Sequence, residues 1–254
     1  MRVSWGGGCL DFVVRETFFQ DINGEAIKTS RAPNASTQRA LIERSIFQGT
    51  WRDGIDTTGG FKDSVVRDCI LRRNDVGGVG GGIDIKTVIE PKTADTDMHP
   101  DLMNKNIRIE RCQFIDVPNA IVITAVDRAN RPTVENVKQW VPHEIYIDDC
   151  TFERTRDWPN ITRAILLKGG HTIRWNNAQR RGDVVFFGTM MPRKDSRGTY
   201  GESTMAALAT VNFDVGGTEL PVAEPQPYNE DVPFPHGPQR ALPPGKPVTP
   251  ASGP

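Results

Sequence analysis

The feature that most constrains this chain is a phrase that recurs along it. Each copy reads as a short strand, a polar bend and a second strand, and a further apolar segment follows. The equivalent points of the six copies are Thr17, Ser45, Cys69, Cys112, Cys150 and Ala178. Their separations are 28, 24, 43, 38 and 28 residues. A repeat of this length is typical of a solenoid, in which each coil contacts only its neighbours.

The residue types within each unit favour strands. Val and Ile dominate the apolar segments, and no segment of convincing length has the apolar period of a helix. These features predict an all-β fold, a right-handed parallel β-helix (solenoid) of about six to seven coils over residues 1–216. The two long coils carry insertions at roughly residues 88–103 and 126–141, at one corner, where a solenoid tolerates them.

The two ends of the chain differ from the repeat. No amphipathic helix precedes the first coil, although the open edge of a solenoid needs protection. We therefore expect either that further coils precede Met1 or that the uncapped end self-associates. Residues 217–254 hold 11 of the 19 prolines, which predicts an irregular Pro-rich tail or strap and not an independent domain.

Stacked coils turn equivalent residues into ladders, because parallel strands lie about 4.8 Å apart. Side chains alternate along a strand, so one ladder of the second apolar segment faces the core. We expect that ladder to contain Ile27, Ile55, Ile83, Ile121, Ile165 and Val185. A second core stack is expected from Phe19, Phe47, Leu71, Phe114 and Phe152. Cys69, Cys112 and Cys150 form a further inward ladder as small apolar fillers, although their spacing leaves disulfides undecided.

The residue after each core isoleucine faces outward. This outward ladder reads Lys28, Asp56, Asp84, Val122 and Leu166. The flanking columns add carboxylates at Glu25 and Asp53, and they add cations at Lys86, Arg163 and Lys168. The pattern therefore predicts an exposed strip on which carboxylates cluster between cationic side chains.

The doubled aspartate of this strip suggests a metal site. Asp56 and Asp84 lie one coil apart, at about 5 Å, and two like charges at that distance need a proton, a cation or hydrogen bonds in compensation. Together with Asp53 they offer hard oxygen ligands without His or Cys, which suits Ca²⁺. The alternative is that the Asp-Gly pairs shape turns and the aspartates solvate an exposed face.

Composition excludes several classes of partner. Lys+Arg 31 against Asp+Glu 32 gives a net charge of -1, and no basic stripe alternates with aromatic residues, so we expect no nucleic-acid partner. No apolar run reaches the length of a membrane span, and the first residues lack the layout of a signal peptide. We expect no membrane partner and find no visible targeting segment.

The segment DGIDTTGGFKDSVVRDC, residues 53–69, is similar to a segment of the pectate-lyase superfamily of right-handed parallel β-helices. The coil phrases resemble that superfamily over residues 11 to about 190. The resemblance implies that Asp53 and Asp56 bind calcium, that Asp84 joins them from the next coil, and that Lys86 is a groove lysine. No W-I-D-H element precedes Asp56, which leaves pectate itself and the identity of the base open.

The resemblance further implies a polysaccharide lyase that cleaves an acidic, uronic-acid polysaccharide by calcium-assisted β-elimination, in a groove on the outer face. The sugar carboxylate must be neutralised before its α-proton can be removed, and Ca²⁺ and a cationic side chain supply that charge. The candidate catalytic residues are Lys86, Arg163 and Lys168. An extracellular or periplasmic location is expected from the same resemblance.

Two other functions fit the same groove. A glycoside hydrolase would use Asp56 and Asp84 as acid and base or nucleophile, and their one-coil separation suits a retaining pair. A non-catalytic sugar-binding or structural β-helix, of the tailspike or adhesin type, needs no reacting group at all.

Overall fold

The structure is a computed structural model of the chain. It describes residues 3–5, 8–29, 36–58, 60–74, 81–89, 103–127, 141–189 and 214–229. Every regular element in these ranges is a β-strand, which confirms the expected all-β class. Within the same ranges, no helix is long and apolar enough to cross a membrane.

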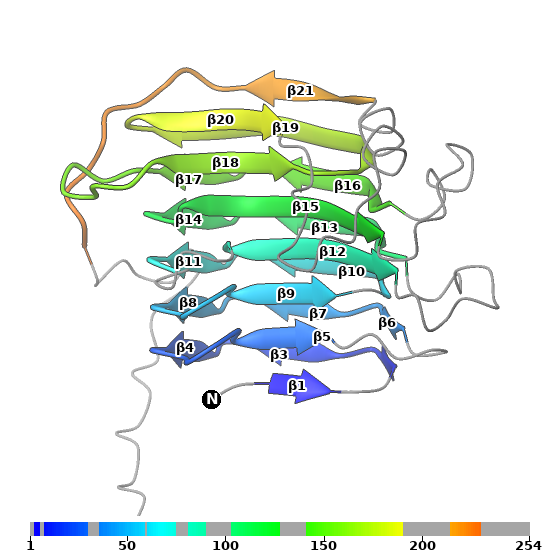
Figure 1. Cartoon of the computed structure of the whole chain (residues 1–254). Coiled ribbons are helices and arrows are strands. Elements are labelled where there is room, and N and C mark those ends of the chain that lie inside the picture. The colour runs from blue at the N-terminus through cyan, green and yellow to red at the C-terminus, as the bar shows by residue number, and fades with distance from the viewer. Residues whose placement is uncertain are drawn as a thin grey trace, which may run out of the picture.

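The strands form two sheets with parallel pairing. In both sheets the strands follow one another along the same direction (Figure 1). Sheet A has seven strands, in the order β1-β5-β9-β12-β15-β18-β20. Their bounds are β1 Val3–Trp5, β5 Ile27–Thr29, β9 Ile55–Thr58, β12 Ile83–Ile89, β15 Asn119–Asp127, β18 Thr162–Leu167 and β20 Val184–Thr189. All six pairings within sheet A are parallel, so the expected parallel arrangement is confirmed.

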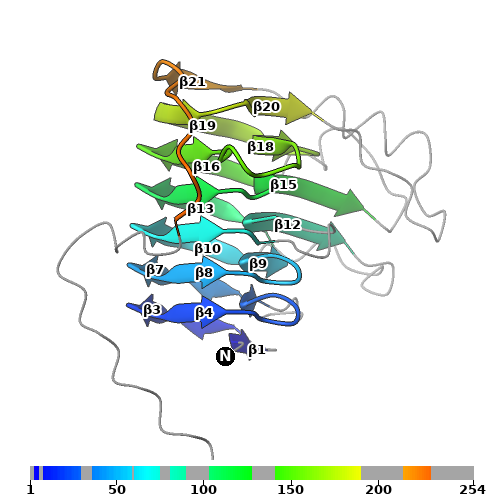
Figure 2. The same cartoon turned by 90° about the vertical axis from the view of Figure 1, so that its left-hand side faces the viewer.

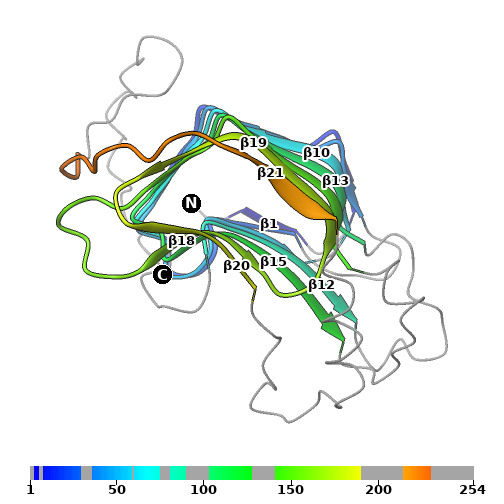
Figure 3. The ribbon, with the colours of Figure 1, turned by 90° about the horizontal axis from the view of Figure 1, so that it is seen from above.

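Sheet B has 14 strands. They are β2 Cys9–Leu10, β3 Val13–Arg15, β4 Phe18–Gln20, β6 Thr37–Gln38, β7 Leu41–Glu43, β8 Ile46–Gln48, β10 Phe61–Arg67, β11 Ile70–Arg72, β13 Lys105–Glu110, β14 Gln113–Ile115, β16 His143–Asp148, β17 Thr151–Glu153, β19 His171–Arg181 and β21 Val215–Glu219. Strand β19 pairs with β16 in its first half and with β17 in its second, so it joins the two flanks of this sheet. Seen from above, sheets A and B lie on opposite sides of the interior (Figure 3).

A repeated backbone bend separates the two flanks of sheet B. At this bend each coil has one residue with φ between 46° and 55°: Glu16, Arg44, Asp68, Arg111, Asp149 and Asn177. Non-glycine residues seldom adopt this left-handed conformation, and Asn and Asp tolerate it best. Each bend lies directly before the expected equivalent points, from Thr17 to Ala178, so the bend is what turns the chain at each copy of the phrase.

The core contains the expected ladders. Cys69, Cys112 and Cys150 are fully buried free thiols, which settles the question of disulfides for them. The rings of Phe114 and Phe152 stack with centroids 5.1 Å apart. The rings of Phe19 and Phe47 stack in the same way at 4.9 Å. Repetition of one residue type at one position therefore fills the interior, as the spacing predicts.

The inner ladder of sheet A is confirmed in five coils and wrong in the sixth. Ile27, Ile55, Ile83, Ile121 and Ile165 pair in register and all are buried. In β20, however, Ile165 pairs with Phe187, whereas Val185 pairs with Arg163 and is 44% exposed. The prediction is displaced by two residues because β20 is a continuous apolar run whose pattern does not reveal the register, and its buried residues are Val184 and Phe186.

The C-terminal segment crosses the coils (Figure 2). Strand β21 pairs with β19, and residues 220–229 then descend along sheet B. The backbone N–H of Leu220 donates to Ala178, that of Ala223 to Arg180 and that of Gln226 to the Glu153 side chain. We call residues 220–229 the strap. Residues 230–254 of the predicted tail lie outside the described residues.

Candidate functional site

The outward ladder of sheet A has the expected register. Lys28 pairs with Asp56, Asp56 with Asp84, Asp84 with Val122, and Val122 with Leu166. We call these five residues the outer ladder.

Its exposure differs from the expectation. Asp56 is 1% exposed and Asp84 6%, so the predicted exposed strip of carboxylates is wrong. One physical reason is that the Lys28 and Lys86 side chains lie against the carboxylates and cover them. These two lysine side chains are themselves 28% and 27% exposed.

Lys28 and Lys86 form ion pairs with different sets of carboxylates at sheet A. Lys28 Nζ lies 2.7 Å from Asp56 Oδ2 and 2.9 Å from Glu25 Oε1. Lys86 Nζ lies 2.6 Å from Asp84 Oδ2 and 3.7 Å from Asp56 Oδ1. Asp56 is thus bracketed by ammonium groups from the coils on either side of it. The partly exposed lysines form the outer surface, and the carboxylates lie beneath them.

Three carboxylates converge at one point of the ladder. Glu25, Asp53 and Asp56 offer oxygen atoms that all lie within 4.8 Å of one another, and all three side chains are buried. The predicted metal set was Asp53, Asp56 and Asp84, so the structure brings Glu25 into the group. The signal for Glu25 was its separation of one coil from Asp53, in the same flanking column.

Asp53 and Asp84 differ in how their carboxylate oxygens are partnered. Asp53 Oδ1 accepts a hydrogen bond from the backbone N–H of Gly81. Asp84 Oδ1 is buried, and it has no hydrogen-bond partner within the described part of the chain. An ionised oxygen in that state costs free energy, since burial removes its water. A hard cation beside these oxygens would supply the missing partner, so the donor set fits Ca²⁺.

Burial and neighbouring charges shift the pKa values of the acidic groups and of Lys86 in this cluster. Burial raises the pKa of Asp53 well above its ordinary value, and the charges of Asp84 and Asp56 raise it further. Burial also raises the pKa of Asp84, against the lowering effect of Lys86. Burial lowers the pKa of Lys86, but the charges of Asp84 and Asp56 outweigh it, so this pKa lies well above its usual value. Lys86 is therefore protonated at neutral pH.

The two remaining predicted catalytic residues lie at opposite ends of β18. Arg163 is in register with Asn119, in the column of Asp53, whereas Lys168 follows Leu167. The charge of Lys168 lowers the pKa of Asp84, which places it within electrostatic range of the cluster. Arg163 lies three coils from Asp53, about 14 Å at the strand spacing. The structure thus groups Lys168 with Lys86 and sets Arg163 apart.

Comparison with known proteins adds no relative. No protein-family model matches the chain, and no curated protein sequence or solved structure matches it either.

Proposed function

We propose that this chain is a right-handed parallel β-helix similar to the pectate-lyase superfamily, and that sheet A binds an acidic, uronic-acid polysaccharide. The parallel in-register strands and the one-coil ladders support the fold assignment. The observation that carries the function is the layer of partly exposed cations above a floor of buried carboxylates.

The surface chemistry suits a polyanion. Lys28, Lys86 and Lys168 each present a half-buried side chain on the outer side of sheet A. Successive lysines of these three lie two coils apart, about 10 Å at the strand spacing, so a polymer with regularly placed carboxylates can meet several cations at once. Repeated weak contacts along one chain add up to useful affinity. Arg163 lies at the other end of β18 from Lys168, so it widens the cationic surface across sheet A.

The buried carboxylates beneath the lysines are the proposed metal-binding residues. Asp53, Asp56 and Asp84, with Glu25, are the residues that would hold Ca²⁺. When bound, this ion would supply positive charge that stabilises the carboxylate of a uronic acid and acidifies its α-proton. The unpartnered Asp84 Oδ1 supports this assignment independently of the clustering.

For β-elimination, the residues divide into roles. In the metal-free cluster Lys86 is protonated, so its role there is to neutralise the sugar carboxylate. Lys168 and Arg163 are the candidates for the base. Lys168 is the better placed of the two, because it shares the column of Lys86.

Two observations favour binding without cleavage as a second candidate. The raised pKa of Lys86 in the metal-free cluster opposes its role as a base, and the outer ladder beyond Asp84 is apolar at Val122 and Leu166. The hydrolase alternative needs Asp56 and Asp84 to reach a glycosidic bond. Their burial and their ion pairs with Lys28 and Lys86 oppose that role.

The test measures binding and cleavage separately. Affinity electrophoresis and calorimetry with pectate, alginate, glucuronan and glycosaminoglycans, each with calcium and with chelator, should reveal one polymer that binds. Lys86→Gln and Lys168→Gln should weaken that binding. Arg39→Gln, which removes an exposed cation from the bend between β6 and β7, is the matched control and should leave the binding unchanged.

The ultraviolet absorbance of unsaturated uronates then reports elimination. A calcium-dependent rise that is lost in Lys168→Gln establishes the lyase. Binding without any rise establishes the second candidate. If the wild-type protein binds none of the polymers, the proposed function is wrong.

A further inference from the structure

A second region with the features of a ligand site lies on sheet B, beneath the strap. The cavity there has a volume of about 420 Å³, within the usual range of ligand pockets, about 300–1,000 Å³. Its lining comes from β14, β17 and β19 on one side and from the strap on the other. The lining residues are Gln113, Ile115, Glu153, Thr155, Arg181, Gln226, Pro227, Tyr228 and Asn229.

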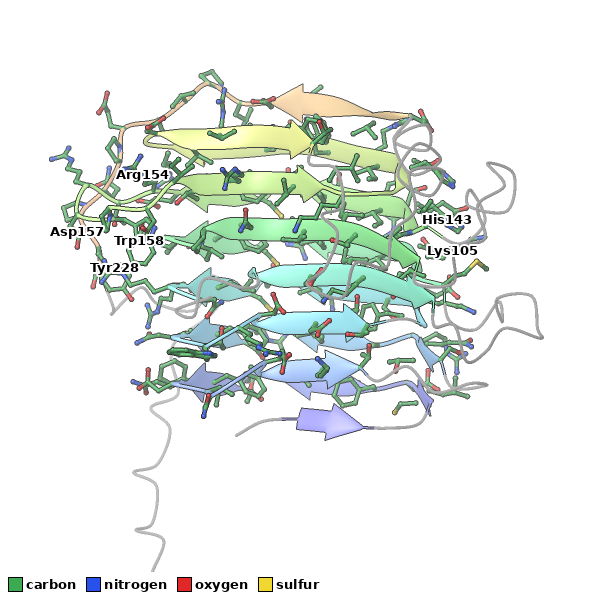
Figure 4. All side chains as sticks on the ribbon, viewed as in Figure 1. Lys105, His143, Arg154, Asp157, Trp158 and Tyr228 are labelled. Carbon is green, nitrogen blue, oxygen red and sulfur yellow. The ribbon has the colours of Figure 1, made fainter. Side chains whose placement is uncertain are left out.

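The strap is anchored where it forms this wall. The guanidinium carbon of Arg73 lies 3.4 Å from the centroid of the Tyr228 ring and 5.4 Å from that of Trp158. Arg73 is held in turn by Asp116 at 3.3 Å and Asp157 at 3.1 Å. Asp157, Trp158 and Tyr228 gather at one edge of the stack, opposite Lys105 and His143 (Figure 4). The cavity wall is therefore fixed before any ligand arrives, which lowers the entropic cost of binding.

Two charged side chains of opposite sign line the cavity. Glu153 is 7% exposed, and its Oε1 accepts a hydrogen bond of 3.2 Å from the backbone N–H of Gln226. Burial raises the pKa of Glu153, and the nearby positive charge of Arg181 offsets this only in part. Arg181 Nε is buried and has no hydrogen-bond partner among the described residues. Arg181 also lines the cavity, so its guanidinium is the positively charged group that a ligand would meet there.

The carboxyl, guanidinium and amide groups that line the cavity together favour a ligand with hydroxyl groups. A free anion would meet the carboxyl of Glu153, and a cation would meet Arg181. A hydroxyl group both accepts and donates, so it can accept a hydrogen bond from the Arg181 guanidinium and donate one to the Glu153 carboxyl. The amides of Gln113, Gln226 and Asn229 offer further donors and acceptors around the same space. Several hydroxyls on one small ring would satisfy this set together.

We propose that the cavity between β17, β19 and the strap binds a neutral sugar unit, with Arg181 and Glu153 holding adjacent hydroxyls. This site lies on sheet B and uses none of the residues assigned to sheet A. It therefore stands or falls independently of the proposed polysaccharide function.

The test uses the full chain. Saturation-transfer NMR and calorimetry are run with glucose, galactose, mannose, N-acetylglucosamine and their disaccharides, and with glucuronate and galacturonate for comparison. We expect one neutral sugar to bind more tightly than either uronate. Arg181→Gln should weaken that binding by about tenfold or more, the effect of losing a hydrogen bond to a charged group.

A matched variant separates the cavity from its surroundings. Arg180→Gln makes the same chemical change one residue away, outside the lining, and should alter the affinity by less than about twofold. Asn229→Ala, at an exposed strap position, should also weaken binding, and it keeps the test valid if Arg181→Gln does not fold. Thermal melting followed by circular dichroism checks the fold of each variant. Polysaccharide binding at sheet A should be unchanged in Arg181→Gln.

Three outcomes would overturn the proposal. The first is that no sugar of the panel binds the wild-type protein. The second is equal affinity in folded Arg181→Gln, Asn229→Ala and Arg180→Gln, which would put the sugar elsewhere. The third is tighter binding of a uronate than of every neutral sugar, which would contradict the balance of charge in the cavity.

Discussion

Most residues of the inner and the outer ladder of sheet A are buried, but the two ladders differ in chemistry. The inner ladder repeats isoleucine in β5, β9, β12, β15 and β18. The outer ladder on the same strands changes from Lys28 through Asp56 and Asp84 to Val122 and Leu166. One face is uniform along the stack, and the other changes from charged to apolar. The difference shows that burial by itself does not identify what stabilises a ladder.

The energetics of the two faces also differ. Full burial of an isoleucine contributes about 1.5–3 kcal/mol, and each coil adds a similar amount. A buried ion pair contributes little net stability, because the cost of removing its water nearly cancels the attraction. The inner face therefore accounts for the stability of sheet A, while the outer face tolerates charges that are useful for binding. Substitutions on each face test this division.

The largest expected effect comes from the inner face. Ile83, 1% exposed, packs between Ile55 and Ile121. Ile83→Ala should lower the free energy of unfolding by about 2–5 kcal/mol through lost burial and a cavity. Ile83→Val, which removes one carbon, should cost only about 0.5–1.5 kcal/mol. Urea denaturation with an unchanged m-value provides the measurement, and a loss below that of Ile83→Val would contradict the division.

An effect of intermediate size is expected for Asp53→Asn in the presence of chelator, and here the free energy of unfolding should increase. The raised pKa of Asp53 means that the folded protein holds this proton more tightly than the unfolded chain does. Its contribution is therefore most favourable below about pH 4, where the carboxyl is protonated in both states, and is lost as pH rises through the folded pKa. Asparagine does not titrate, so Asp53→Asn should gain stability relative to the wild type as pH rises, by about 1 kcal/mol.

Urea denaturation across a pH series checks this difference. The two proteins should have similar stability in acid and should diverge toward neutral pH. A variant that loses stability relative to the wild type as pH rises would show that Asp53 is stabilising when ionised. Asp53→Asn should also bind Ca²⁺ more weakly than the wild type, which calorimetry with the metal alone would measure.

The smallest expected effect concerns a single hydrogen bond on the outer face. Thr58 Oγ1 donates to Asp56 Oδ1 at 2.6 Å, and the Thr58 side chain is half-buried. Thr58→Val keeps the shape of the side chain and removes the donor, so the loss of stability should stay below about 1 kcal/mol. A loss as large as that of Ile83→Ala would mean that the outer network is as important as the core.

Much of the fold could be predicted from the sequence because the coils stack in parallel, so residues at equivalent positions of successive repeats become neighbours in space. The equivalent points from Thr17 to Ala178 hold even across the two long coils, since only one corner absorbs the extra residues. The prediction failed at Val185, where an apolar run provides no alternation to fix the register.

The sequence by itself determined which residues share a ladder, because a side chain's column follows from its position within a repeated unit. Only the tertiary structure decided how those columns are used. It placed Lys28 and Lys86 against the carboxylates, and it buried Asp56 and Asp84 where exposure was expected. It also brought the strap against β17 and β19, which created the cavity beside Arg181. These contacts join residues far apart in the chain and depend on side-chain orientation, so no local pattern contains them.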